Sequence, residues 1–439
     1  QSATEIDLSH FALWYSQSGT PEISLSHQFN AQTGKHNFTL SQTTPATADQ
    51  ATKQPLYIPV AIEIIDEDGN QYVDEQGLIS NGLIILDTPS LSFSVSATTE
   101  KLTPVLLGNF SAPVTIDDDL SRDERRHIMR YDTDLFNRWD SAQTLISDEI
   151  LSAAANPLVP VDDYAIAALA DGFGHILADP SCLDYFKAAI LTMPAISVLE
   201  SRMTPADPVA LFHARLAVET ALGQHMQDHY KQALDPQTSA KLAATAGGRA
   251  LRNRLLALAV AAGDGAADDV AIAQVLDNNM TLSQGALAAV NNRPTVVRDS
   301  VLATFHDRWQ NNALVLEKWF SFESMSCISG CIERLEELMQ HPAFDPKNPN
   351  KLRVVLSAFM TGNPIRFYAA DGSGFEFIAD CLIDIDKRNP QLAARMALPL
   401  TRMGAYSDAR QHQMRQVLER MQTAVQSTDL GEVIEKALA

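Results

Sequence analysis

The spacing of the hydrophobic residues changes at Asp117-Asp118-Asp119, and this change constrains the fold more than any other feature of the chain. Over residues 22–116, apolar and polar residues alternate in short runs, which is typical of half-buried strands. After the acidic triplet the apolar residues recur with the period of an α-helix. The sequence therefore predicts a multidomain β + α protein, with a small β domain before a large all-α domain.

The first domain, residues 22–116, is predicted to be an Ig-like β-sandwich. It contains about seven short runs of strand character, separated by turn signals every 8–12 residues or so. The longest run, 56–65, contains Pro59, which predicts an edge strand or a bulge because proline cannot donate a ladder hydrogen bond. No cluster of catalytic residue types occurs here, so we interpret this domain as a spacer.

The second domain, residues 117–439, is predicted to be a superhelical, solenoid-like array. Ser121-Arg122-Asp123-Glu124 has the pattern of a capping box that opens the first helix. Long helices are expected over 122–152 and 208–234, and the breaks between helices are short and rich in Gly, Asn, Asp and Pro. Without a strict sequence repeat, such a pattern still favours a curved array with a concave face.

The charge and the cysteines limit the partners and the compartment. The 54 acidic against 33 basic residues give a net charge of −21, which repels nucleic acid and anionic membrane surfaces. No run of about 18 apolar residues occurs, so we expect no membrane span. The chain starts at Gln1, and we expect it to be a piece of a longer protein. Four cysteines do not make a disulfide framework, and they predict ordinary buried thiols in a cytoplasmic protein: Cys182, Cys327, Cys331 and Cys381.

The familiar catalytic motifs are absent from the sequence. It contains no His-Glu-x-x-His, no phosphate-binding glycine loop and no Gly-x-Ser-x-Gly. His225 and His229 stand four residues apart, but Met226 occupies the place of a general base, so we interpret the pair as a solvated helix face. Gly372-Ser373-Gly374 is interpreted as a tight turn.

The aromatic residues of segment 309–322 permit two interpretations. Trp309, Trp319, Phe320 and Phe322 could form a platform for a ligand. Their spacing is helical, however, and this favours a place in the core.

Three Asn-Pro pairs predict closely spaced helix starts near the C-terminus. They are Asn348-Pro349, Asn363-Pro364 and Asn389-Pro390. Asn caps the free amides of the first turn, and Pro at the first helical position gives up a donor that lacks a partner anyway. Arg353 and Arg395 follow the first and last of these starts and flank an apolar stripe, an unusual place for a charge.

Several stretches resemble the aminopeptidase N family of zinc aminopeptidases over essentially the whole chain. Segment 14–21 (WYSQSGTP) is similar to the segment that closes the catalytic domain of that family. Segment 53–59 (KQPLYIP) is similar to the sandwich domain of its bacterial branch. The helical C-terminal domain is matched by segments 309–320, 348–350, 371–374 and 388–391.

The resemblance implies a division into three parts: residues 1–21 as the tail of a catalytic domain with the junction, then the sandwich, then the helical domain. In the family, zinc is held by His-Glu-x-x-His and a later Glu, and none of these matches a position here. We therefore predict no catalytic residue and no metal ligand in this chain, with zinc only in the full-length enzyme. The implied partners are the protein's own N-terminal and catalytic domains and its peptide substrates.

The resemblance also implies a role for two arginines. Family members carry arginines on the inner face of the helical domain, toward the part of the peptide distant from the zinc, and Arg353 and Arg395 match two such positions by motif. A guanidinium offers paired donors to a carboxylate or a carbonyl. The alternative is that each arginine forms an ordinary salt bridge between helices.

The predicted function is the non-catalytic C-terminal part of a zinc aminopeptidase, inactive alone, which encloses the active-site chamber and controls access to it. The alternative is a stand-alone α-solenoid scaffold whose concave face binds a protein partner.

Overall fold

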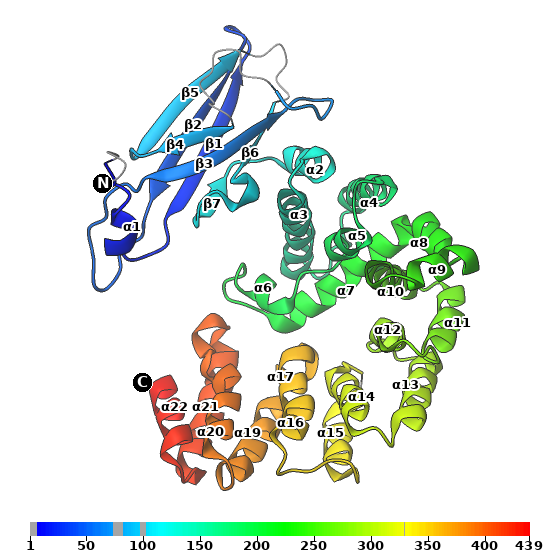
Figure 1. The fold of residues 1–439 in the computed structure, drawn as a ribbon. Helices are drawn as coiled ribbons and strands as arrows, with labels where there is room; N and C mark the ends of the chain where they lie inside the picture. The colour runs from blue at the N-terminus through cyan, green and yellow to red at the C-terminus, as the bar shows by residue number, and fades with distance from the viewer. Residues whose placement is uncertain (1–6, 73–81, 97–101, 329) are drawn as a thin grey trace. The chain divides into compact units, whose positions relative to one another are not determined.

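The computed structural model describes residues 7–72, 82–96, 102–328 and 330–439. The chain divides into two compact units, Gln1–Leu145 and Ile146–Ala439. The first contains the strands and the first helices, and the second contains helices only (Figure 1). The predicted order, an Ig-like sandwich before an all-α solenoid-like domain, is confirmed.

The first unit holds two sheets in the part that the structure describes. One sheet has the order β5-β2-β1-β7 and the other has the order β4-β3-β6. Pairing is antiparallel except between β1 and β7, which run parallel. The bounds are β1 (Glu22–Asn30), β2 (Lys35–Thr43), β3 (Ile58–Ile65), β4 (Leu83–Leu86), β5 (Ser90–Ser96), β6 (Thr103–Leu106) and β7 (Thr115–Asp118).

The core of this unit follows from the alternation of the strands. Along β2, His36, Phe38, Leu40 and Gln42 are buried while most of their neighbours are not. Phe38 and Leu40, together with inward residues of β1 and β3, belong to one apolar cluster. Period-two patterning thus places one face of each strand in the core.

Pro59 lies in a central strand, so the prediction of an edge strand is wrong for β3 as a whole. The first half of β3, which contains Pro59, pairs only with β4, whereas Ile62–Ile65 pair with β6. The proline therefore faces a ladder on one side only, which is where a residue without an amide donor is tolerated.

The segment before the sandwich is less helical than expected. The apolar residues of segment 5–16, such as Phe11, Leu13 and Trp14, predict a helix there. In the structure α1 covers only Leu13–Ser16, and residues 5 and 6 lie outside the described residues. The Trp14 indole donates to the Tyr57 carbonyl at 2.9 Å, and the Gln17 side chain exchanges two hydrogen bonds with the backbone of Gln54. A helix as short as α1 is not stable by itself, so tertiary contacts with segment 53–59 hold this part of the chain in place.

The capping box at Ser121 is confirmed, but the first long helix is divided. Ser121 and Glu124 bond reciprocally at the start of α2 (Arg122–Tyr131). The chain then turns, and Asp134 accepts a hydrogen bond from the Phe136 amide to open α3 (Leu135–Ala155). A side-chain cap in the middle of a helical pattern competes with continuation of the helix.

The helix predicted over 208–234 is divided as well. α7 (Pro208–His225) ends at Met226, whose φ of −98° and ψ of 20° leave the helical range, and α8 (Gln227–Leu234) begins directly after it. Met226 is fully buried, so packing holds its backbone in this conformation.

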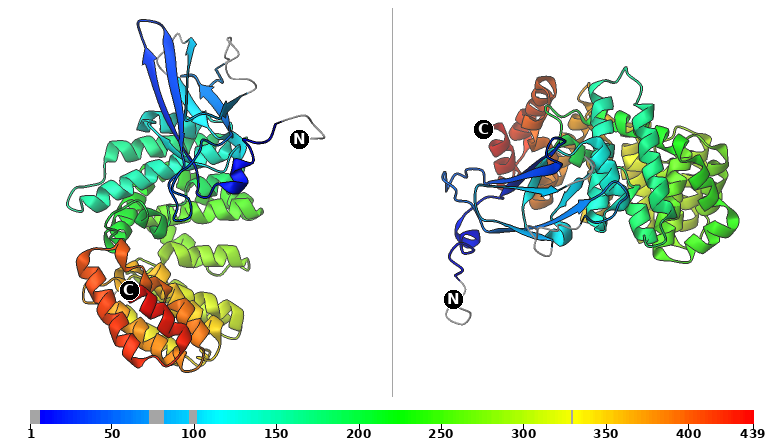
Figure 2. Two further views of the ribbon diagram at one scale, coloured as in Figure 1. Left: turned by 90° about the vertical axis from the view of Figure 1, so that its left-hand side faces the viewer. Right: turned by 90° about the horizontal axis from the view of Figure 1, so that it is seen from above.

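The second unit is a series of short helices that follow one another along a curved path (Figures 1 and 2). Helices that are neighbours in sequence are in contact, for example α12 with α13, α13 with α14 and α21 with α22. Besides those above and below, the bounds are α4 (Asp163–Ala178), α5 (Asp184–Ile190), α6 (Ile196–Glu200), α9 (Pro236–Ala243), α10 (Ala246–Ala261), α11 (Gly265–Gln274), α12 (Met280–Val290), α13 (Val296–Trp309), α14 (Ala313–Met325), α15 (Cys331–Gln340), α19 (Ser373–Asp386), α21 (Asp408–Ala424) and α22 (Thr428–Leu438).

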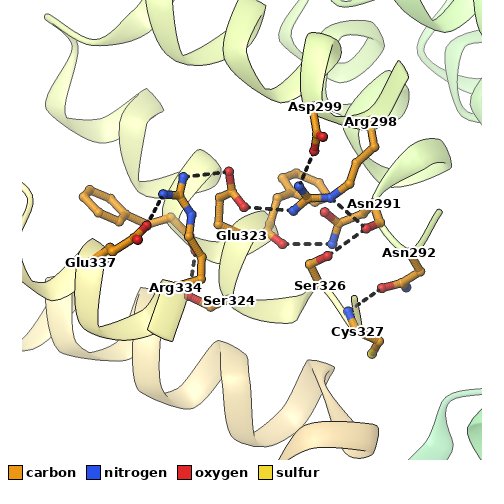
Figure 3. A network of polar contacts seen from close by, with 12 residues as sticks. Asn291, Asn292, Arg298, Asp299, Glu323, Ser324, Ser326, Cys327, Arg334 and Glu337 are labelled. Carbon is orange, nitrogen blue, oxygen red and sulfur yellow. Dashed lines mark hydrogen bonds and ion pairs between the residues drawn. The ribbon is translucent and has the colours of Figure 1, made fainter. Parts of the chain in front are cut away.

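A partly buried network of charges joins three of these helices (Figure 3). The Glu323 carboxylate on α14 accepts from Arg298 Nη2 of α13 at 2.8 Å and from Arg334 Nη2 of α15 at 3.0 Å. Arg298 also donates to the Asn291 carbonyl, and Arg334 to Glu337. One carboxylate thus links α13, α14 and α15.

None of the helices in the described part of the chain combines the length and hydropathy that crossing a bilayer requires.

Candidate functional site

All three Asn-Pro pairs start helices, as predicted. The Asn348 side chain accepts from the Asn350 amide at 2.9 Å, Asn363 from Arg366 at 3.2 Å, and Asn389 from Leu392 at 3.1 Å. The helices that they open are α16 (Pro349–Leu352), α18 (Pro364–Phe367) and α20 (Pro390–Met396), each with proline in the first turn.

Arg353 and Arg395 line the same hollow, although different helices carry them. The hollow has a volume of about 420 Å³ and is otherwise lined by Pro349, Asn389, Gln391 and Leu392. Both arginines follow an Asn-Pro start, and the two starts border the hollow as well. Both arginines were candidate site residues from the sequence, whereas Asn389 was considered as part of a helix start and Gln391 only within a segment of the resemblance.

The backbone at Arg353 is unusual. The helix that begins at Pro349 changes into a π-helical turn, η2 (Arg353–Ser357), before α17 (Ala358–Gly362) continues it. Such single π-turns are rare and occur frequently at functional sites. Arg353 is the first residue of this turn, at the edge of the hollow.

The charges of these two arginines are not neutralised within the described residues. Both side chains are exposed. Arg353 Nη1 lies 3.5 Å from the Asn350 side-chain oxygen, and neither guanidinium forms an ion pair with a described carboxylate. Lys351, two residues before Arg353, is different, because it is buried and its Nζ lies 3.3 Å from Glu317 Oε1. The inter-helix salt bridge considered as an alternative is thus found at Lys351 and not at Arg353.

The hollow can therefore bind an anionic or carbonyl group. No acidic side chain lines it among the described residues, and two guanidinium groups offer forked donors to a carboxylate or a peptide carbonyl. The side-chain amides of Asn389 and Gln391 add neutral polar groups.

The other histidine and glycine motifs have structural roles. His225 and His229 belong to two helices, so the assumption of one common helix face is wrong, and His225 Nε2 lies 2.7 Å from Asp163 Oδ1. Gly372 has a φ of +75° and the Asp371 carboxylate accepts from the Ser373 amide, so the chain turns at Gly372. Ser373 and Gly374 are already the first residues of α19, so the interpretation of the whole segment as a tight turn is only partly right.

The prediction that the aromatic segment belongs to the core is confirmed for Trp319 and Phe320, whereas Trp309 and Phe322 are only partly buried. Trp319 is 6% exposed and Phe320 is fully buried. Trp319 nevertheless borders a hollow of about 640 Å³, together with His306, Arg334 and His341.

The cysteines form no disulfide in the described part of the chain. Cys182, Cys327 and Cys381 take part in no disulfide, and the side chain of Cys331 lies outside the described residues. Burial raises the pKa of the Cys381 thiol to about 12, with the carboxylates of Asp380 and Asp384 adding to the effect. A thiol in such surroundings stays protonated and inert.

The described residues do not fit a zinc site. Nowhere among them do three His, Cys, Asp or Glu side chains come together in a position to hold a metal ion. A zinc site needs three or four such ligands around one point.

The chain consists of an Ig-like sandwich followed by a helical solenoid that carries a basic hollow. This architecture defines the class of protein. Residues 19–119 match the family described as "Domain of unknown function (DUF3458) Ig-like fold". Residues 122–439 match the family described as "Domain of unknown function (DUF3458_C) ARM repeats". The chain belongs to this DUF3458 family.

Similar proteins make the assignment more specific. The chain is 34% identical to "Aminopeptidase N" of Escherichia coli (strain K12) over 446 residues, which cover 100% of the chain and 51% of that protein. It is 30% identical to "Aminopeptidase N" of Haemophilus influenzae over the same shares, and 35% identical to that of Caulobacter vibrioides over 94% of the chain and 48% of the relative. The chain thus spans about half the length of these curated relatives, and the matches fit a C-terminal part of aminopeptidase N.

A solved structure agrees on the fold. The crystal structure of Legionella pneumophila aminopeptidase A in complex with aspartic acid superimposes with a TM-score of 0.80 at 24% identity. The match covers 100% of this chain and 51% of that one. At this identity the likeness shows the fold alone.

Proposed function

We propose that this chain is the non-catalytic C-terminal part of a zinc-dependent aminopeptidase that removes N-terminal residues from peptides. Support comes from the relatives, which are named aminopeptidases and of which the chain covers about half. Zinc and its ligands would belong to the remainder of the protein, and zinc would there supply an activated water. A cytoplasmic location is part of this proposal.

In this proposal the helical domain encloses the active-site chamber and controls the entry of substrates. A curved array, in which each helix packs mainly on its neighbours, presents a wide surface. The fold supports this role, and the acidic composition is compatible with a chamber that admits short peptides.

The observation that carries the proposal is the shared hollow of Arg353 and Arg395. Both guanidinium groups are exposed and lack an ion-pair partner among the described residues. Two unneutralised cations on one hollow suit the carbonyl or carboxylate groups of a peptide beyond its first residues. We propose that they bind this distal part and align it.

The test uses the full-length protein with Arg353→Ala and Arg395→Ala, singly and together. A tetrapeptide with a free carboxylate, its C-terminally amidated form and an aminoacyl anilide are the substrates. We expect each substitution to raise KM for the free tetrapeptide roughly tenfold, because each removes one charged hydrogen bond to the peptide. KM for the anilide, which lacks a distal part, should not change.

Arg388→Ala is the matched control, because Arg388 is a partly exposed arginine just before α20 that pairs with Asp384 and does not line the hollow. Equal effects on peptide and anilide, or an equal effect of the control, would contradict the proposed role of the two arginines.

A second measurement tests the division of labour. The purified chain, supplied with zinc, is expected to show no turnover of aminoacyl anilides. Turnover that co-purifies with the chain through successive columns would show that it contains catalytic residues of its own.

A further inference from the structure

A second basic hollow lies between α7, α10 and α12 and shares no residue with the one above. Its volume is about 390 Å³, within the range of roughly 300–1,000 Å³ usual for small-molecule sites. Three arginines line it, Arg215, Arg254 and Arg293, against one acidic side chain, Glu219. The remaining lining residues are uncharged, and most of them are alanine or glycine.

The guanidinium groups of two of these arginines are fixed by backbone carbonyls. Arg215 Nε donates to the Pro194 carbonyl at 3.0 Å, and Arg254 Nε donates to the Leu191 carbonyl at 2.7 Å. Both acceptors lie near one another in sequence, at and after the end of α5. Anchoring through Nε orients the guanidinium plane and leaves the terminal nitrogens for other partners.

Not all of these terminal nitrogens have a hydrogen-bond partner. Arg254 Nη1 lies 2.8 Å from Glu219 Oε1, but Arg254 Nη2 is buried and has no hydrogen-bond partner in the described part of the chain. A buried donor without a partner costs free energy, which a bound acceptor would recover. No hydrogen bond or ion pair of the Arg293 guanidinium occurs among the described residues either.

Glu219 cannot neutralise the hollow. Burial alone would raise the pKa of its carboxyl group, but the charges of Arg254 and Arg215 outweigh burial and lower that pKa below its ordinary value. The carboxylate is therefore ionised at neutral pH and contributes one negative charge against three positive ones. Burial lowers the pKa of Arg215, the charge of Glu219 opposes this, and the charge of Arg254 adds to it, so Glu219 compensates this guanidinium only in part.

An excess of two positive charges is thus concentrated in a chain whose net charge is −21. We propose that this hollow binds a small dianion with carboxylate or phosphate groups. The forked donors of Arg215, Arg254 and Arg293 suit planar carboxylates and phosphate oxygens equally. The small side chains of α10 and α12 leave the space that such a ligand fills.

Calorimetric titration of the whole chain tests this site, with succinate, inorganic phosphate and monoanionic acetate as probes at one fixed ionic strength. Saturable binding of succinate or of phosphate, clearly tighter than that of acetate, is expected. Whichever of the two binds more tightly identifies the anionic group. Binding that is equally weak for all three probes, or absent at millimolar concentration, overturns the site.

Two substitutions have opposite expected effects. Arg293→Gln removes a donor outside the helices and should weaken binding roughly tenfold or more. Glu219→Gln keeps an acceptor for Arg254, raises the excess charge to three and should strengthen binding. Arg252→Gln on the same helix as Arg254 does not line the hollow and is the control.

An unchanged affinity in Arg293→Gln, or a loss in Arg252→Gln equal to it, contradicts the assignment. Circular dichroism of each variant confirms that the fold is retained. The measurement needs no peptidase activity, so its outcome is independent of the function proposed above.

Discussion

Arg298 Nη2 lies 2.8 Å from Glu323 Oε2, and the two side chains are only 6% and 7% exposed (Figure 3). A buried ion pair adds little stability by itself, but removal of one partner leaves a buried charge without compensation. The pair therefore makes α13 and α14 dependent on one another.

We predict that Glu323→Ala lowers the free energy of unfolding by about 3–5 kcal/mol, because the buried Arg298 then keeps only the exposed Asp299 as an ion-pair partner among the described residues. Glu337→Ala, which removes the 66% exposed partner of Arg334, should change it by no more than about 1 kcal/mol. Urea unfolding of both variants measures the difference. Similar losses of unfolding free energy in the two variants would contradict the prediction, because burial would then not determine the effect of removing one partner of an ion pair.

We predict that His36 makes the stability of the sandwich depend on pH. It is 2% exposed, its Nδ1 has no partner among the described residues, and its Nε2 lies 3.0 Å from His27 Nδ1. Burial lowers the pKa of His36 to about 4, and the charge of His27 adds to this, while Glu124 opposes it.

Because the unfolded chain binds this proton near pH 6.5, stability is complete above that pH and falls as the pH decreases toward 4, by at most about 1.4 kcal/mol per pH unit. His36→Gln should remove this part of the slope in unfolding experiments at a series of pH values. His412→Gln, at an exposed position, should leave the slope unchanged. Identical slopes for His36→Gln and the unmodified chain would refute the prediction.

The three Asn-Pro caps offer a matched series. Asn363 is fully buried and also donates to the Ser326 carbonyl at 2.7 Å, whereas Asn348 and Asn389 are partly exposed. Asn348→Ala and Asn389→Ala should each cost about 1 kcal/mol, the usual value of a lost cap. Asn363→Ala should cost about 2–3 kcal/mol more, because buried backbone groups lose their partners. Equal losses at all three positions in thermal unfolding would contradict this order.

Gly374 is predicted to tolerate no side chain. A Cβ atom there would lie 2.3 Å from the Arg366 carbonyl oxygen, which belongs to backbone that cannot move aside easily. Gly374→Ala should lower the free energy of unfolding by about 1–3 kcal/mol through overpacking. Gly404→Ala is the control, since no atom lies within 4 Å of its added Cβ. A neutral effect at Gly374, measured beside this control, would show that α18 can shift.

Local features of the structure followed from local sequence. The capping box at Ser121 and the Asn-Pro starts depend on side chains that bond the backbone within three residues, so their spacing predicted them. The two long helices predicted over 122–152 and 208–234 are divided at Asp134 and Met226, and this error has a different origin. There the hydrophobic period continues, and a side-chain cap in one case and burial in the other divides the helix.

The sequence by itself determined that a β-sandwich precedes a helical array, because hydrophobic periodicity fixes which face of each segment is buried. It also indicated Arg353 and Arg395 as charges beside an apolar stripe. Only the tertiary structure decided that these two share one hollow, and that Arg215, Arg254 and Arg293 share another with Glu219. Such sites join residues from separate helices, and their proximity depends on how the helices pack, which no local pattern of residues encodes.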